Sequence, residues 1–66
     1  MSAYQLTDKE LTALRMIAQG KVPKQVVRDM QMSPYTYKDV MERVRFRLQA
    51  TTTANAVYIA CQKGIL

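Results

Sequence analysis

The sequence predicts an all-α fold of four helices, in which the second and third helices form a helix-turn-helix. Apolar residues recur at intervals of three and four along the chain, which is the helical period. Gly, Pro, Ser and Thr stand where helices would begin or end. The chain has 66 residues, 48% of them hydrophobic, so we expect one folded domain over residues 1–66 rather than a disordered tail.

The first helix is predicted over residues 8–19. Thr7 and Glu10 have the spacing of a capping box, in which each side chain accepts a hydrogen bond from the other residue's backbone N–H. Leu14 and its apolar neighbours face the core at helical spacing, and Gly20 suits the left-handed conformation that ends a helix.

A second, shorter helix is predicted over residues 23–30. Pro23 suits its first position, and residues 31–33 leave room only for a sharp turn before the next helix. Two helices joined in this way, the second with a charged outer face, are typical of a helix-turn-helix. Gln31 stands where a turn glycine is usual.

The third helix, residues 34–49, organises the chain. Ser33 caps its first turn and Pro34 suits its first position. Apolar spacing of four, three and four predicts a buried face with Tyr37, Met41, Val44 and Leu48. The opposite face carries Tyr35, Asp39, Glu42, Arg43 and Phe46. One side docks on a small core and the other meets a partner, so we interpret this segment as a recognition helix.

The fourth helix is predicted over residues 53–63, between a run of threonines and Gly64. It is apolar almost all round. One stripe packs on the core, and a second stripe consists of Ala54, Tyr58 and Cys61. Because a small domain cannot bury both stripes, the second is predicted to form a homodimer interface.

Composition excludes several classes of function. The ten Lys and Arg against five Asp and Glu give a net charge of +5, which favours a polyanion as partner. Histidine is absent, Cys61 is the one cysteine and no glycine-rich phosphate loop occurs, so we expect no enzyme, catalytic residue, cofactor or metal site. No apolar run approaches the ~20 residues of a membrane span, so we expect a cytoplasmic protein.

The chain resembles the LuxR/GerE-type helix-turn-helix domain from Leu6 to Leu66. The matching residues are Leu6-Thr7, Glu10, Leu14, Ala18-Gln19-Gly20, Lys24, Ser33, Thr36, Lys38, Val44, Leu48, Ala56-Val57, Ala60 and Gly64-Ile65-Leu66. The resemblance implies a four-helix DNA-binding domain that regulates bacterial or phage transcription as a dimer through its last helix. Most members carry a sensing domain ahead of this one. Here Met1 stands five residues before the matching region begins, so we expect a stand-alone unit or a trimmed piece.

The resemblance also implies which residues meet double-stranded DNA. Positions matching Lys38, Asp39 and Glu42 face base edges, whereas those matching Lys24, Thr36 and Arg43 reach phosphates. Together with the resemblance, the cluster of Arg43, Arg45 and Arg47 is interpreted as a further DNA contact. The recognition helix departs from the family pattern, because Tyr37 and Val40 replace its Val and His.

Two interpretations of the outer face remain open. Asp39 and Glu42 either read cytosine or form helix ion pairs, Asp39 with Arg43 and Glu42 with Arg45 or Arg47. Phe46 packs against the fourth helix or against a protein partner. The predicted function is accordingly a dimeric transcription regulator with its third helix in the major groove. The alternative is a small interaction protein of the same fold that binds and inhibits another transcription regulator.

Overall fold

The computed structural model describes residues 6–66, which form four helices and no strand. These helices are α1 (Asp8–Ala18), α2 (Pro23–Asp29), α3 (Pro34–Leu48) and α4 (Thr53–Gln62). Each begins where the sequence predicts and ends one residue earlier, because the expected last residue is the C-cap. The predicted all-α, four-helix fold is confirmed.

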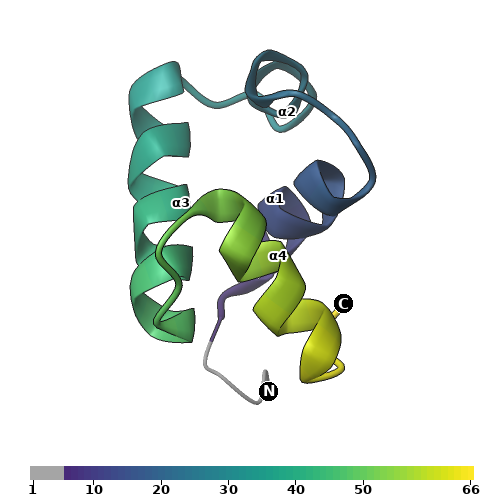
Figure 1. The fold of residues 1–66 in the computed structure, drawn as a ribbon. Coiled ribbons are helices and arrows are strands. Elements are labelled where there is room, and N and C mark those ends of the chain that lie inside the picture. Colours follow the sequence, from purple (N-terminus) through teal and green to yellow (C-terminus); the bar gives the residue numbers. More distant parts are fainter. Residues whose placement is uncertain (1–5) are drawn as a thin grey trace.

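Helix α3 packs against all three other helices and lies along one edge of the molecule (Figure 1). It gives four residues to the core: Val40, Met41, Val44 and Leu48. Val40 is thus buried beside the predicted inner face, and Tyr37 is half-buried at the margin of the core. Because α1, α2 and α4 all lie on one side of α3, its other side is left uncovered (Figure 1).

The predicted helix starts are formed by the expected side chains. In α1 the Thr7 N–H donates to Glu10 Oε1 at 3.1 Å, and the Glu10 N–H donates to Thr7 Oγ1 at 3.1 Å, which completes the capping box. In α3 the Thr36 N–H donates to Ser33 Oγ at 3.0 Å. These bonds satisfy backbone donors that have no partner within the helix.

The turn of the helix-turn-helix is built without glycine. Gln31 adopts the left-handed conformation, with φ of 53°, at the position where the sequence lacks the usual glycine. The turn is closed by the Met32 N–H, which donates to the Val27 carbonyl at 3.0 Å. A non-glycine residue pays roughly 1–2 kcal/mol for this conformation, so the turn geometry is kept at some cost in stability.

Candidate nucleic-acid interface

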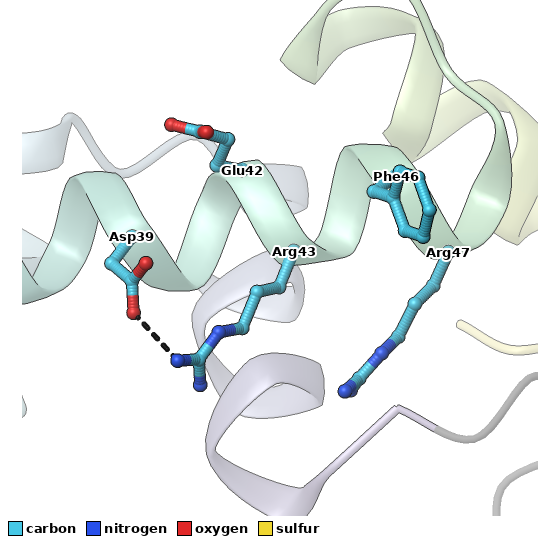
Figure 2. A pocket seen from close by; sticks show the side chains of 5 residues that line it. All are labelled: Asp39, Glu42, Arg43, Phe46 and Arg47. Carbon is cyan, nitrogen blue, oxygen red and sulfur yellow. Dashed lines mark ion pairs between the residues drawn. The ribbon is translucent and has the colours of Figure 1, made fainter.

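The uncovered side of α3 is a polar surface with two aromatic rings. Tyr35 and Phe46 are 83% and 84% exposed, and Asp39 and Glu42 lie exposed between them. Two shallow hollows lie along this side. One is lined by Asp39, Glu42, Arg43, Phe46 and Arg47 (Figure 2), and the other by Tyr35, Lys38, Asp39 and Glu42. We call the exposed side from Tyr35 to Phe46 the outer face of α3.

Asp39 and Arg43 form an ion pair on the outer face. Asp39 Oδ2 lies 3.0 Å from Arg43 Nη2, one helical turn away (Figure 2). Both side chains are more than half exposed, so the pair adds little to stability. Its effect is instead to neutralise the charge of Arg43 locally. The pair is the one that the ion-pair interpretation of Asp39 predicts.

Glu42 does not form the ion pair that the helix-pairing interpretation predicts. Arg45 and Arg47, the expected partners, point to other groups, and within residues 6–66 no cation lies within ion-pair distance of Glu42. Figure 2 shows the Glu42 side chain extending away from those of Arg43 and Arg47. That interpretation of Glu42 is therefore wrong, and its carboxylate stays open to solvent.

Arg45 and Arg47 connect α3 to its neighbours. Arg45 Nη1 donates to Thr53 Oγ1 at 3.3 Å, at the start of α4. Arg47 Nη1 donates to Glu10 Oε1 in the first turn of α1, and the Glu10 side chain is 3% exposed. The arginine cluster is thus divided, since Arg43 lies on the outer face while the other two hold helices together.

Arg45 also acts on Tyr37. Burial raises the pKa of the Tyr37 hydroxyl above its usual value, and the positive charge of Arg45 lowers the pKa in part. The phenol therefore stays protonated and uncharged at neutral pH. It contributes to the margin of the core rather than to the outer face.

The remaining predicted DNA-contacting residues lie on α2 and early α3. Lys24 is exposed in the first turn of α2 and Lys38 is exposed on α3. Neither lysine forms an ion pair in the part of the chain that the structure describes. Thr36 is half-buried, and its Oγ1 accepts from Ser33 Oγ at 3.0 Å, so its hydroxyl also supports the helix start.

Phe46 does not pack against α4. Its ring is 84% exposed on the outer face, while the core side of α3 is filled by Val44 and Leu48. Of the two alternatives for Phe46, packing against the fourth helix is therefore wrong, and contact with a protein partner stays a prediction. Phe46 is the 13th residue of the helix, and helical rotation directs it away from both core residues.

The two stripes of α4 differ in burial as the sequence predicts. Ala56 and Ala60 are fully buried against the core, whereas Ala54, Tyr58 and Cys61 are exposed. Tyr58 is 61% exposed, although its ring is large and mostly apolar. The second stripe is therefore available to a partner.

Two kinds of feature are missing from residues 6–66. These residues contain no group of three or more side chains that could hold a metal ion. None of their helices is long and apolar enough to cross a membrane.

Sequence reasoning missed the contact between Glu10 and Arg47. The two residues are 37 positions apart, and no local pattern connects them. The capping box, which Glu10 does form, is a complete explanation of this residue at the level of the sequence. A buried carboxylate needs a cation or donors, and that requirement was the signal that could have pointed to a second partner.

Comparison of this chain with known proteins identifies its family. The GerE domain, described as "Bacterial regulatory proteins, luxR family", matches residues 4–60. This chain belongs to the luxR family. As a luxR-family helix-turn-helix domain it is 40% identical over 62 residues to the "Transcriptional regulatory protein YdfI" of Bacillus subtilis (strain 168). It also superposes on the "Crystal structure of the phage VqmA-DPO complex" with a TM-score of 0.87 at 26% identity.

These matches cover 94% of this chain but only 29% of YdfI and 28% of the phage VqmA chain. The chain thus spans less than a third of the length of either relative. The match establishes its family and its fold as those of transcription regulators.

Proposed function

We propose that this luxR-family domain binds double-stranded DNA as a homodimer and lays the outer face of α3 in the major groove. The observation that carries this proposal is the division of α3 between two sides. Its inner side is buried by the other three helices, and its outer side is uncovered along the whole helix. A major groove about 12 Å wide admits one α-helix, so α3 can enter it without any change in the fold.

The exposed cations support phosphate contacts on both helices of the motif. Lys24 on α2 and Lys38 on α3 pair with no carboxylate within residues 6–66, so their charges are available to phosphates. Thr36 and Arg43 lie on the same helix as Lys38, and Arg45 lies at its end beside Thr53. We assign Glu42 to base edges, and Lys24, Thr36, Lys38, Arg43 and Arg45 to the phosphate backbone, with Asp39 paired to Arg43 on the same side of α3.

The dimer is proposed to form through the exposed stripe of α4, which contains Ala54, Tyr58 and Cys61. A two-fold dimer would present two copies of α3 to successive major grooves, about 34 Å apart. The site of action is then the bacterial cytoplasm, where the DNA is. The proposal needs no catalytic residue, metal or cofactor.

A salt-titrated binding measurement on genomic fragments tests this function. We expect modest affinity that falls steeply with salt, because each neutralised phosphate contributes about 0.9 to the slope of log K against log salt. Lys38→Ala should weaken binding to every sequence and make the slope shallower by about that amount. Lys9→Ala removes the same charge from α1, outside the two helices of the motif, and is the matched control.

Absence of DNA binding at ~50 mM salt, with the fold and the dimer intact, would contradict the proposal. If Lys9→Ala weakens DNA binding as much as Lys38→Ala does, Lys38 contributes only through the net charge of the domain.

A second function is supported by a separate observation. The charges of Lys38 and Arg43 are balanced by Asp39 and Glu42, and Phe46 is exposed among them. Such a neutral, aromatic surface suits a protein partner better than phosphates, because interface cores are depleted of unbalanced charge. The alternative proposal is thus a domain that binds and inhibits another transcription regulator. Phe46→Ala would then weaken that complex and leave DNA binding unchanged.

A further inference from the structure

Four residues form the outermost line of α3. Tyr35, Asp39, Glu42 and Phe46 follow one another at intervals of four, three and four, so their side chains project from the same side of the helix. Both hollows of the outer face lie along this line. If α3 enters a major groove, this line is the part that points to the groove floor.

Glu42 can act only as a hydrogen-bond acceptor in that position. Its carboxylate is exposed and pairs with no cation within residues 6–66, unlike that of Asp39. Cytosine offers the N4 amino donor to the major groove and no acceptor of its own there. Adenine offers a similar donor but places its N7 acceptor beside it, which repels a carboxylate.

Phe46 offers no hydrogen bond at all. Its ring is 84% exposed and borders the same hollow as Glu42 and Arg43 (Figure 2). The C5-methyl of thymine is the apolar group that the major groove presents. A ring held at the edge of a hollow on the groove-facing line can cover that methyl and exclude water from it.

We propose that Glu42 and Phe46 determine sequence specificity by reading pyrimidines, Glu42 through cytosine N4 and Phe46 through the thymine methyl. This inference rests on the proposed DNA-binding function. The two residues are four apart, so they are about 6 Å apart along the helix axis. With a rise of about 3.4 Å per base pair, the cytosine and the thymine lie roughly two steps apart.

The first experiment uses the whole wild-type chain and a pool of random duplexes. Selection yields the preferred half-site, and the same selection with Phe46→Ala and Glu42→Gln identifies the base pair that each residue reads. Phe46→Ala should lose one thymine preference only. Glu42→Gln should change one cytosine preference to adenine, because glutamine pairs with adenine N6 and N7.

The second experiment removes the methyl group from the DNA instead of the ring from the protein. Uracil in place of the selected thymine should weaken wild-type binding about fourfold, the effect of burying one methyl-sized group. The same replacement should leave binding by Phe46→Ala unchanged. Uracil at a thymine elsewhere in the half-site is the matched control, and it should cost both proteins nothing.

Each outcome decides a different point. Equal uracil penalties in both proteins, or unchanged pyrimidine preferences in both variants, refute this inference and leave the proposed function standing. If the wild-type chain binds no DNA at all, both this inference and the proposed function are refuted. If both variants bind a partner protein less well while their DNA selection is unaltered, the outermost line of α3 is a protein interface. That outcome also refutes the inference.

Discussion

Glu10 in the first turn of α1 and Arg47 in the last turn of α3 form an ion pair that joins the start of one helix to the end of another. The same Oε1 of Glu10 accepts from the Thr7 N–H and from Arg47 Nη1. One buried carboxylate therefore both caps α1 and fixes α3 against it. The orientation of the recognition helix depends on how α1 begins.

Arg47→Ala should lower the free energy of unfolding by about 1–3 kcal/mol, because it leaves the buried Glu10 carboxylate without its cation. Urea denaturation monitored by circular dichroism measures the change. Arg43→Ala is the matched control, since this arginine lies one turn away on the same helix and pairs with the exposed Asp39. The control should cost at most ~0.5 kcal/mol. If Arg47→Ala and Arg43→Ala lower the free energy of unfolding equally, burial of Glu10 adds nothing to the strength of its ion pair.

Thr7→Ala should lower the free energy of unfolding by about 0.5–2 kcal/mol, because the Glu10 N–H loses the acceptor at 3.1 Å. In a domain of this size, each kcal/mol lowers the melting temperature by roughly 4–8 °C. Thr12→Ala, an exposed position within α1, is the control and should be neutral or slightly stabilising. A melting curve for Thr7→Ala that matches the wild type would mean that the cap contributes nothing in solution.

The caps and the inner face of α3 could be predicted from the sequence because both depend on residues close together in the chain. Ser33 lies three positions from the amide that it caps, and Met41 and Val44 share a face through the helical period alone. The family resemblance rested on the same local spacing, and the family match confirms it.

The tertiary contacts of polar side chains could not be predicted in this way. Arg47 pairs with Glu10 and not with Glu42, because the fold brings the start of α1 beside the end of α3. Helical spacing puts Glu42 within reach of Arg45, three positions further on, but it cannot show that the fold directs that guanidinium to Thr53 at the start of α4. The choice between α4 and a protein partner for Phe46 stays open from the sequence for a similar reason, since the exposure of its ring depends on where α4 packs.

Tyr58→Glu should convert the proposed dimer into a folded monomer. In a two-fold interface through α4, the new carboxylate would be buried against its symmetry mate, which costs several kcal/mol unless the interface opens. Sedimentation equilibrium measures the mass and circular dichroism checks the fold. Thr12→Glu adds the same charge on α1 and should leave the dimer unchanged. Wild-type protein that sediments as a monomer at high micromolar concentration would contradict the dimer.

Asp39→Ala should tighten binding to every DNA sequence alike. The change removes a negative charge from the groove-facing line and frees Arg43, whose guanidinium lies 3.0 Å from Asp39 Oδ2. One additional cation for phosphates should make the slope of log K against log salt steeper by about 0.9. Salt-titrated anisotropy on two unrelated duplexes measures both effects.

The matched control for Asp39 is Asp8→Ala, which raises the net charge equally but lies in the first turn of α1 and releases no arginine. It should change affinity slightly and leave the salt slope as it is. If Asp39→Ala instead weakens binding to one duplex and not to the other, Asp39 itself reads a base. The Arg43 pair would then serve to orient the Asp39 carboxylate, because an ion pair held by two exposed side chains breaks readily when a base offers a better donor.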